Sequence, residues 1–205
     1  MAQLIIPNTG YSMFKNNNYS NPDAVENVIR YITRTRQDEQ KMNDIVAYGG
    51  AGVGYYLSVE DIIQQFQYVQ KTYNIASRGG RRIYHEVFNL FDEEMDAIEY
   101  DPNILWKIGM ECCQEYFKMG HQAIFAVHYE GGKRFHFHFV VNAINFLTGM
   151  KWHSYFYDLG CREYVFARIL YKHMAQAKNV FIPFTVAVRM YGFQQQYIRG
   201  RVILT

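Results

Sequence analysis

The clearest pattern along the chain is an alternation of histidines with large apolar residues over 135–141, FHFHFVV. A period of two is typical of a β-strand, in which residues two apart point to the same face. The apolar run AIFAVH at 123–128 predicts a second strand, and Gly131 and Gly132 between the two runs favour a turn. Together the two segments predict a β-hairpin.

The predicted hairpin gathers three of the chain's seven histidines. His136 and His138 project from the same face of their strand, followed on that face by Val140 and Asn142. His128, on the neighbouring strand, can lie across from them. Three imidazoles that converge on one face can bind a divalent metal ion and leave positions open for a substrate. The alternative is that these are structural, hydrogen-bonded histidines.

Apolar positions at helical spacing and capping residues place the other elements. The pairs Asn21-Pro22 and Asp101-Pro102 are typical helix starts, and Ser58 with Asp61 resembles a capping box. The glycine-rich stretch 49–54 predicts a flexible turn, because it lacks the lysine of a phosphate-binding loop. Helices are expected over 22–36, 59–73, 102–119 and 159–176, and further strands over 3–6, 83–91 and 179–192.

These elements predict an α+β fold, a mostly antiparallel central sheet with packed helices. Helices and strands alternate along the chain, but the hairpin requires antiparallel pairing. A length of 205 residues favours a single domain over 1–205, and 49% hydrophobic residues are ample for a core.

Charge and cysteine content bear on the cellular compartment but do not identify a ligand. The net charge of +2 neither demands nor excludes nucleic acid, so any basic surface must be local. Three cysteines, two of them adjacent at Cys112 and Cys113, do not form a disulfide framework. The N-terminus lacks the apolar core of a signal peptide, and no stretch has the length of a membrane span. We therefore expect a cytoplasmic protein without membrane insertion.

A longer stretch around the predicted hairpin has a family resemblance. Residues 120–153, GHQAIFAVHYEGGKRFHFHFVVNAINFLTGMKWH, resemble the metal motif of plasmid and integrative-element relaxases, the mobilisation branch of the HUH endonuclease superfamily. That motif has a first histidine, a His-hydrophobe-His strand, an apolar pair with an asparagine, and a Thr-Gly turn. The matching residues are His128, 136–138, 140–142 and 148–149. Tyr129-Glu130 stands where Thr-Asp is usual, which leaves the acidic group of the site open.

Two further segments resemble relaxase motifs. AVENVIRYITRTR at 24–36 is similar to the first motif, whose helical tyrosine is the nucleophile in the family, so the resemblance implies that Tyr31 is catalytic. From its position alone, Tyr31 would be a tyrosine at the edge of the core. IYHEVFNLF at 83–91 resembles a histidine-bearing strand of the family, which implies that His85 is catalytic through contact with the scissile phosphate or the nucleophile; the alternative is a structural histidine. Glu86 should face the opposite side of that strand unless a bulge intervenes.

The remaining candidates complete the expected site. The residues expected to support the metal ligands are Glu86, Glu130 and Asn142. The expected DNA contacts are Arg34, Arg36, Arg81, Arg82, Lys133 and Arg134.

The resemblance implies a tyrosine-dependent relaxase that nicks and rejoins single-stranded or hairpin DNA at an origin of transfer. It implies Mg²⁺ or Mn²⁺ as the working ion, although three imidazoles also suit Zn²⁺ or Ni²⁺. Partners expected from the family are an accessory DNA-binding protein and a coupling ATPase. A rolling-circle replication initiator, a non-catalytic DNA-binding protein on a relaxase fold, and a metal-dependent oxygenase or hydrolase are alternatives that the sequence leaves open.

Overall fold

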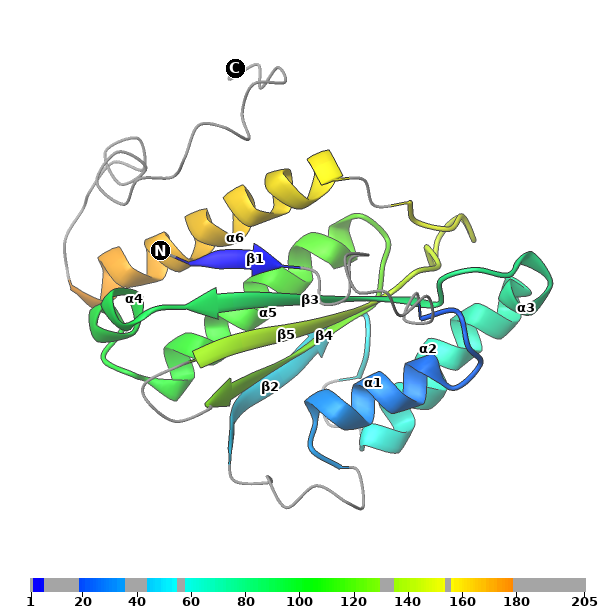
Figure 1. The fold of residues 1–205 in the computed structure, drawn as a ribbon, viewed down its shortest axis with the longest axis horizontal. Coiled ribbons are helices and arrows are strands. Elements are labelled where there is room, and N and C mark those ends of the chain that lie inside the picture. The colour runs from blue at the N-terminus through cyan, green and yellow to red at the C-terminus, as the bar shows by residue number, and fades with distance from the viewer. Residues whose placement is uncertain are drawn as a thin grey trace, which may run out of the picture.

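A five-stranded antiparallel sheet forms the centre of the computed structural model (Figure 1). The structure describes residues 2–5, 19–35, 44–54, 58–129, 135–153 and 156–178. The strands lie in the order β1-β3-β5-β4-β2. Their bounds are Gln3–Ile5 for β1, Ile45–Ala51 for β2, Ile83–Leu90 for β3, Ala123–Tyr129 for β4 and Phe135–Asn142 for β5. Neighbouring strands pair antiparallel throughout, which confirms the expected α+β class.

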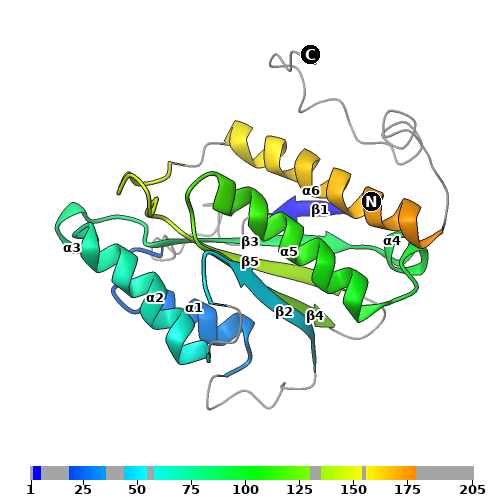
Figure 2. The same cartoon turned by 180° about the vertical axis from the view of Figure 1, so that it is seen from behind.

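Helices pack on both faces of the sheet. The helices α5 and α6 cover one face, and α5 lies in front of the strands in the reverse view (Figure 2). The helices α1 and α2 cover part of the other face. Their bounds are Ala24–Ile32 for α1, Val59–Thr72 for α2, Ile75–Arg78 for α3, Asp92–Ala97 for α4, Pro102–Lys118 for α5 and Phe156–Ala177 for α6. Within the described residues, no helix is both long and apolar enough to cross a membrane.

The alternation along β5 divides the strand between two environments. Phe137, Phe139 and Val141 belong to the core beneath α5 and α6 and have no exposed surface. Full burial of one such side chain contributes about 1.5–3 kcal/mol to folding. The intervening residues point to the opposite face, where Val140 joins the smaller core beneath α1 and α2. The larger core therefore fixes the direction in which the histidines of β5 project.

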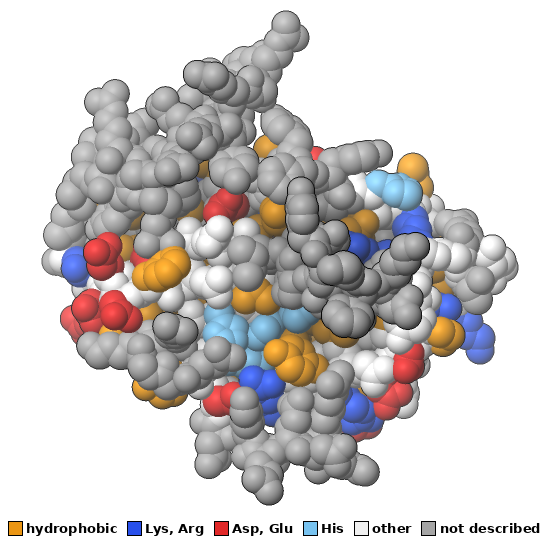
Figure 3. Space-filling view, viewed as in Figure 1, with side chains coloured by type: hydrophobic (Ala, Val, Ile, Leu, Met, Phe, Trp, Pro, Cys, Tyr) orange, Lys and Arg blue, Asp and Glu red, His pale blue; other side chains and the backbone are white. Residues whose placement is uncertain are grey.

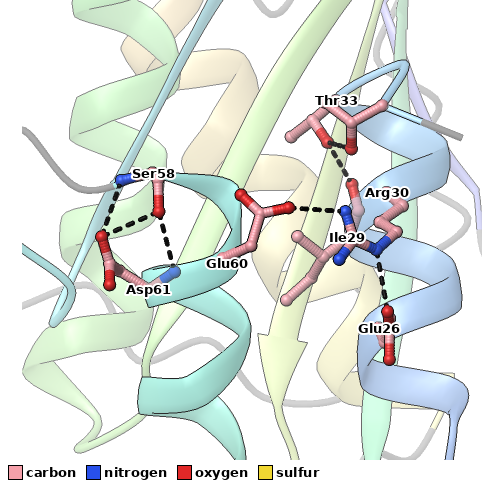
Figure 4. Close-up of polar contacts among 8 residues, drawn as sticks. Glu26, Ile29, Arg30, Thr33, Ser58, Glu60 and Asp61 are labelled. Atoms are coloured by element: carbon pink, nitrogen blue, oxygen red, sulfur yellow. Dashed lines mark hydrogen bonds and ion pairs between the residues drawn. The ribbon is translucent and has the colours of Figure 1, made fainter.

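Apolar contacts hold α1 against the histidine-bearing face. Ile29 and Ile32 are fully buried in one cluster with Ile124 and Val140 of the sheet. A polar link also joins α1 to α2, since Arg30 donates to Glu60 at 2.8 Å (Figure 4). Exposed ion pairs of this kind contribute only about 0–1 kcal/mol. The position of α1 therefore depends mainly on its apolar stripe.

Several helix boundaries agree with the sequence signals. Ser58 and Asp61 form the expected capping box at the start of α2. The side chain of Asp101 caps α5, in which Pro102 is the first residue. Gly120, just beyond α5, has a φ of +85°, a left-handed conformation that suits glycine.

The expectation of a helix over 22–36 is wrong at both ends. The N-cap is Asp23 rather than Asn21, and the helix ends at Ile32. Arg34 has a φ of 52°, in the left-handed region, so the chain leaves the helical path there. Helical periodicity alone did not indicate this early end.

The expectation of a turn over 49–54 is wrong for its first half, because β2 extends to Ala51 and the chain bends only from Gly52, whose φ is +73°. Gly49 and Gly50 lie within β2, opposite Phe125 and Ile124 of β4. A Cβ atom at Gly50 would lie 2.6 Å from the backbone oxygen of Ala123, so these glycines allow close approach rather than a turn. Residue 6 of the first expected strand and the expected strand over 179–192 lie outside the described residues.

A buried ion pair lies on the sheet face away from the histidines. The Glu86 carboxylate is fully buried and accepts hydrogen bonds from the Tyr116 hydroxyl at 2.6 Å and from Arg162 Nε at 3.1 Å. The Arg162 guanidinium also lies over the Trp152 ring, 4.7 Å from its centroid. Glu86 thus joins α5 and α6 to the sheet.

Removing one partner of this pair should be costly. We expect Arg162→Met to lower the free energy of unfolding by about 3–5 kcal/mol, because it leaves the buried Glu86 carboxylate without its positively charged partner and with the hydrogen bond from Tyr116 alone to offset this. The double variant Glu86→Leu/Arg162→Met should be more stable than the single variant. Urea denaturation measures both, with Lys172→Met as the control for an exposed pair with Glu111. Equal stability of Arg162→Met and Lys172→Met would contradict this account.

Candidate functional site

The β4–β5 hairpin brings three histidines together on one face of the sheet. His128 and His136 are directly opposite each other in the antiparallel register, and His138 is opposite Ala126. The ring centroids of His128 and His138 are 4.4 Å apart, and those of His136 and His138 are 4.7 Å apart. One nitrogen from each of the three rings lies within 4.8 Å of the others. Histidine side chains gather near the middle of the face shown in Figure 3.

This cluster fits a divalent ion. All three side chains are buried, and imidazole is a common ligand for such ions. The Nε2 atom of His138 is buried and has no hydrogen-bond partner among the described residues. An unpaired buried polar atom costs about 1–3 kcal/mol, and coordination of an ion would satisfy it. His128, His136 and His138 are therefore the residues that would hold the metal.

The other nitrogen of His138 faces a fourth histidine. His85, on the adjacent strand β3, places its Nε2 atom 2.8 Å from His138 Nδ1. Its Nδ1 atom lies 3.2 Å from the hydroxyl of Tyr19. His85 therefore contacts the candidate metal ligand His138, and Tyr19 in turn contacts His85.

His128 is held by the last residue of α1, Ile32, and by Arg34 just beyond the helix. Its Nε2 atom is 2.6 Å from the backbone oxygen of Ile32, and its Nδ1 atom is 3.0 Å from Arg34 Nη2. A guanidinium can only donate, so Nδ1 accepts and the Nε2–H group donates to Ile32. Arg34 is also paired with the Asp44 carboxylate through two hydrogen bonds of 3.1 and 3.0 Å. The lone pair of His128 thus points at Arg34 in this structure.

The helix α1 places Tyr31 beside the histidine cluster. The Tyr31 ring centroid lies 5.6 Å from that of His138, 6.1 Å from that of His85 and 6.4 Å from that of His128, with the rings edge-on to one another. The Arg34 guanidinium carbon lies 5.1 Å from the Tyr31 ring centroid. Tyr31 is partly exposed, whereas Ile29 and Ile32 of the same helix are buried. The tyrosine therefore borders both the cluster and solvent.

Burial keeps the imidazoles of His85, His128 and His138 neutral. Desolvation, together with the nearby histidines, lowers the pKa of His85 to about 4. Desolvation is also the main cause that lowers the pKa of His128 to about 4, with Arg34 acting in the same direction. The pKa of His138 is lowered further by burial and by its histidine neighbours. Neutral imidazole is the form that binds a metal ion.

Two residues expected to support the metal ligands have other contacts. Glu86 faces away from the histidines, as strand alternation predicts, and its partners are Tyr116 and Arg162. Asn142 is fully buried and bonds to Gln70 and to the backbone of Phe66, both in α2. Asn142 therefore ties α2 to β5, and neither residue bonds to a histidine ring of the cluster through a contact seen here.

The expected DNA contacts that the structure describes differ in burial and in their partners. Arg34 is buried and bonded to Asp44 and His128, so in this structure its guanidinium is not presented to a phosphate. Arg81 lies over the Tyr84 ring at 4.8 Å, and Arg82 Nε donates to the backbone oxygen of Ser20. Three further expected DNA contacts, Arg36, Lys133 and Arg134, lie outside the described residues. The same holds for Glu130, the third residue expected to support the metal ligands.

Sequence reasoning missed Tyr19 and Asp44. Tyr19 lies in a polar stretch and contacts His85, which is 66 positions away along the chain. Asp44 immediately precedes β2 and contacts Arg34, which is ten positions away along the chain. Neither residue has a local pattern that marks it as part of a site.

The low pKa values predict an acid-sensitive metal-free protein. The unfolded chain binds protons at its histidines near pH 6.5, whereas His85 and His128 in the fold do so only near pH 4. Stability must therefore fall as the pH is lowered through this window, by up to about 3 kcal/mol for each of the two histidines. Urea unfolding in the presence of a chelator measures this fall, which should be smaller in His85→Gln. A wild-type fall no larger than that of the variant would contradict the prediction.

Arg34 should oppose metal binding at His128. It donates to Nδ1 of this ring, so it competes for the lone pair if Nδ1 binds the ion and disfavours the Nδ1–H tautomer if Nε2 does. We expect Arg34→Gln to bind Zn²⁺ about tenfold more tightly, a change typical of groups bonded to a metal ligand. Calorimetric titration tests this, with Arg30→Gln as a control that removes the same charge from an exposed site. Unchanged or weaker binding in Arg34→Gln would overturn the inference.

Comparison with known families agrees with this geometry. The sequence model of the family described as relaxase, MobA/VirD2-like, nuclease domain, matches residues 31–174. The match begins at Tyr31, covers more than half of the chain and includes the three clustered histidines. No curated protein matches the chain. The chain therefore belongs to the relaxase family of MobA/VirD2-like nuclease domains, metal-dependent enzymes that nick DNA.

Proposed function

We propose that this relaxase cleaves and rejoins one DNA strand through a covalent link to Tyr31. The observation that carries the proposal is the position of the Tyr31 ring, 5.6 Å from the ring of His138 in the candidate metal cluster. A nucleophile must lie beside the group that stabilises the phosphate under attack. α1 brings Tyr31 to this position, although it is far from the hairpin in sequence.

The chemistry of the proposal is phosphoryl transfer to a phenol. The Tyr31 hydroxyl oxygen attacks phosphorus and loses its proton, while the bond from phosphorus to the 3′ oxygen breaks and that oxygen gains a proton. The products are a 5′-phosphotyrosine and a free 3′-hydroxyl. When bound by the three histidines, a divalent ion supplies Lewis-acid stabilisation of the charge on the phosphate. The covalent link retains the energy of the broken bond, so the 3′-hydroxyl can attack it and rejoin the strand.

The phenol must lose its proton as it attacks phosphorus. The ordinary pKa of a tyrosine is about 10, well above neutral pH, so the hydroxyl requires assistance from its surroundings. The Tyr31 ring lies beside the rings of His138 and His128, and an ion held by the clustered histidines would supply positive charge near the attacking oxygen.

The proposed ion is Mg²⁺ or Mn²⁺, with Zn²⁺ or Ni²⁺ able to occupy the same nitrogens. Three imidazoles are a softer ligand set than Mg²⁺ prefers, so the later transition ions should bind more tightly. The ion with the highest affinity need not support the fastest cleavage.

The proposed substrate is single-stranded or hairpin DNA at an origin of transfer. Arg81, Arg82 and three residues outside the described part, Arg36, Lys133 and Arg134, are the proposed contacts to its phosphates. We further propose that residues 1–205 act as one nicking-and-joining domain in the cytoplasm, for conjugative mobilisation. An accessory DNA-binding protein and a coupling ATPase complete the proposed assembly.

Loss of the Tyr31 hydroxyl should abolish strand transfer without loss of the metal. We expect Tyr31→Phe to lower the rate of covalent adduct formation at least about a thousandfold, because no other group replaces the attacking oxygen. The assay incubates the protein and Mn²⁺ with single-stranded origin DNA and separates the adduct on a denaturing gel. Tyr48→Phe removes a hydroxyl from an exposed tyrosine and should leave the rate unchanged. Adduct formation by Tyr31→Phe at the wild-type rate would exclude Tyr31 as the nucleophile.

A further inference from the structure

A line of three polar side chains runs away from the candidate metal cluster. It starts at His138, whose Nδ1 atom lies 2.8 Å from His85 Nε2, and continues from His85 Nδ1 to the Tyr19 hydroxyl at 3.2 Å. The two histidines are each about 5% exposed, and their rings are stacked with centroids 5.0 Å apart. At the other end of the line, the buried Nε2 atom of His138 has no hydrogen-bond partner in the part of the chain that the structure describes.

Donor and acceptor arithmetic allows this line only two directions. A neutral imidazole carries one N–H group and one lone pair, so each ring must accept at one nitrogen and donate at the other. If His138 donates from Nδ1, His85 accepts at Nε2 and donates from Nδ1 to the Tyr19 oxygen. If Tyr19 donates instead, every bond reverses and His138 carries its proton on Nε2.

Only one direction leaves a lone pair at the cluster. When His138 carries its proton on Nδ1, its Nε2 atom offers a lone pair to an ion. In the reverse direction Nε2–H is a buried donor without an acceptor among the described residues, which costs free energy, and a protonated Nε2 cannot coordinate an ion. The identity of the nitrogen that binds a metal is set by the hydrogen bond that the other nitrogen makes.

We propose that His85 and Tyr19 are positioning residues, which hold His138 in the tautomer that binds the metal ion through Nε2. The proposal rests on the metal site of the proposed function. It assigns His85 a hydrogen bond to the metal ligand His138 instead of a contact with the phosphate. Tyr19 is the terminal acceptor of the line, and its own hydroxyl hydrogen points away from His85.

Both ends of the line are fixed by the backbone. The antiparallel register of β3 and β5 pairs Val87 with His138 and His85 with Val140, which places the two histidine rings on one sheet face. Tyr19 has a φ of 52°, a conformation that a non-glycine residue adopts only where its surroundings impose it. The backbone N–H of Arg82 donates to the Tyr19 carbonyl at 2.8 Å, and Arg82 Nε donates to the carbonyl of Ser20. Arg82, next to β3, thus holds Tyr19 where it meets His85.

Histidine tautomers can be read directly by long-range ¹H–¹⁵N nuclear magnetic resonance of the full chain loaded with Zn²⁺, which is diamagnetic. We expect His138 to carry its proton on Nδ1 and to bind Zn²⁺ through Nε2, and His85 to carry its proton on Nδ1. The Nδ1–H tautomer is the less common form of a free imidazole, so its presence at His85 is diagnostic. His85 protonated on Nε2, or His138 bound through Nδ1, would overturn the proposal.

Variants at His85 test the same point by affinity. We expect His85→Leu to weaken Zn²⁺ binding about 10–100-fold, because His138 Nδ1–H loses its acceptor. The amide oxygen of Gln can accept that bond, so His85→Gln should restore most of the affinity. His173→Leu removes another buried histidine, on α6 at the opposite face, and should bind Zn²⁺ as the wild type does. Wild-type affinity in His85→Leu would contradict the proposal, and the tautomer measurement decides if that variant does not fold.

The outcomes separate this proposal from the proposed function. If the wild-type protein takes up no Zn²⁺, both the metal site and the positioning role are overturned. If Zn²⁺ binds and His85 has the wrong tautomer, only the positioning role fails. A covalent adduct that persists in Tyr31→Phe would overturn the nucleophile and leave the role of His85 intact.

Discussion

The strand β5 is buried on both faces, and the rest of the site depends on which of its side chains point to each face. Its phenylalanines enter a core beneath α5 and α6, where each is held by several aromatic neighbours. Because the side-chain period of a strand is two, that core leaves His136 and His138 no choice of direction. A shift of register by one residue would place imidazoles in the apolar core and phenylalanines beside Tyr31. Hydrophobic packing on one face therefore specifies the position of the ligands on the other.

Because the imidazoles are buried, their nitrogens need hydrogen-bond partners or a metal ion within the protein. Neutral rings in a dry environment still have a donor and an acceptor to satisfy. His128 satisfies both with Ile32 and Arg34, whereas the Nε2 atom of His138 has no described partner. The two rings therefore differ. His138 can bind an ion through Nε2 without losing a described hydrogen bond, whereas His128 must first lose its bond to Ile32 or to Arg34. That coupling links metal binding to the segment that carries Tyr31.

The hairpin, the facing of its histidines and the capped starts of α2 and α5 could be predicted from sequence, because each depends on residues close together in the chain. The resemblance to relaxases added Tyr31, which periodicity alone would treat as one tyrosine among many. The burial of Arg34 against Asp44 and the contact of Tyr19 with His85 could not be predicted, since no local sequence pattern marks either pair. The place of Gly49 and Gly50 in a strand could not be predicted either, because glycine marks close approach as well as turns and only the neighbouring strand distinguishes the two.

The central claim is that three imidazoles from two paired strands hold one ion beside Tyr31. Anomalous diffraction from crystals of the protein grown with Zn²⁺ tests this claim most directly. The account predicts a single anomalous peak on the sheet face beneath α1, about 2.0–2.1 Å from one nitrogen each of His128, His136 and His138, the usual zinc–imidazole distance. It further predicts that the Tyr31 side chain borders the same ion. A peak elsewhere on the molecule, with the three rings uncoordinated, would contradict it.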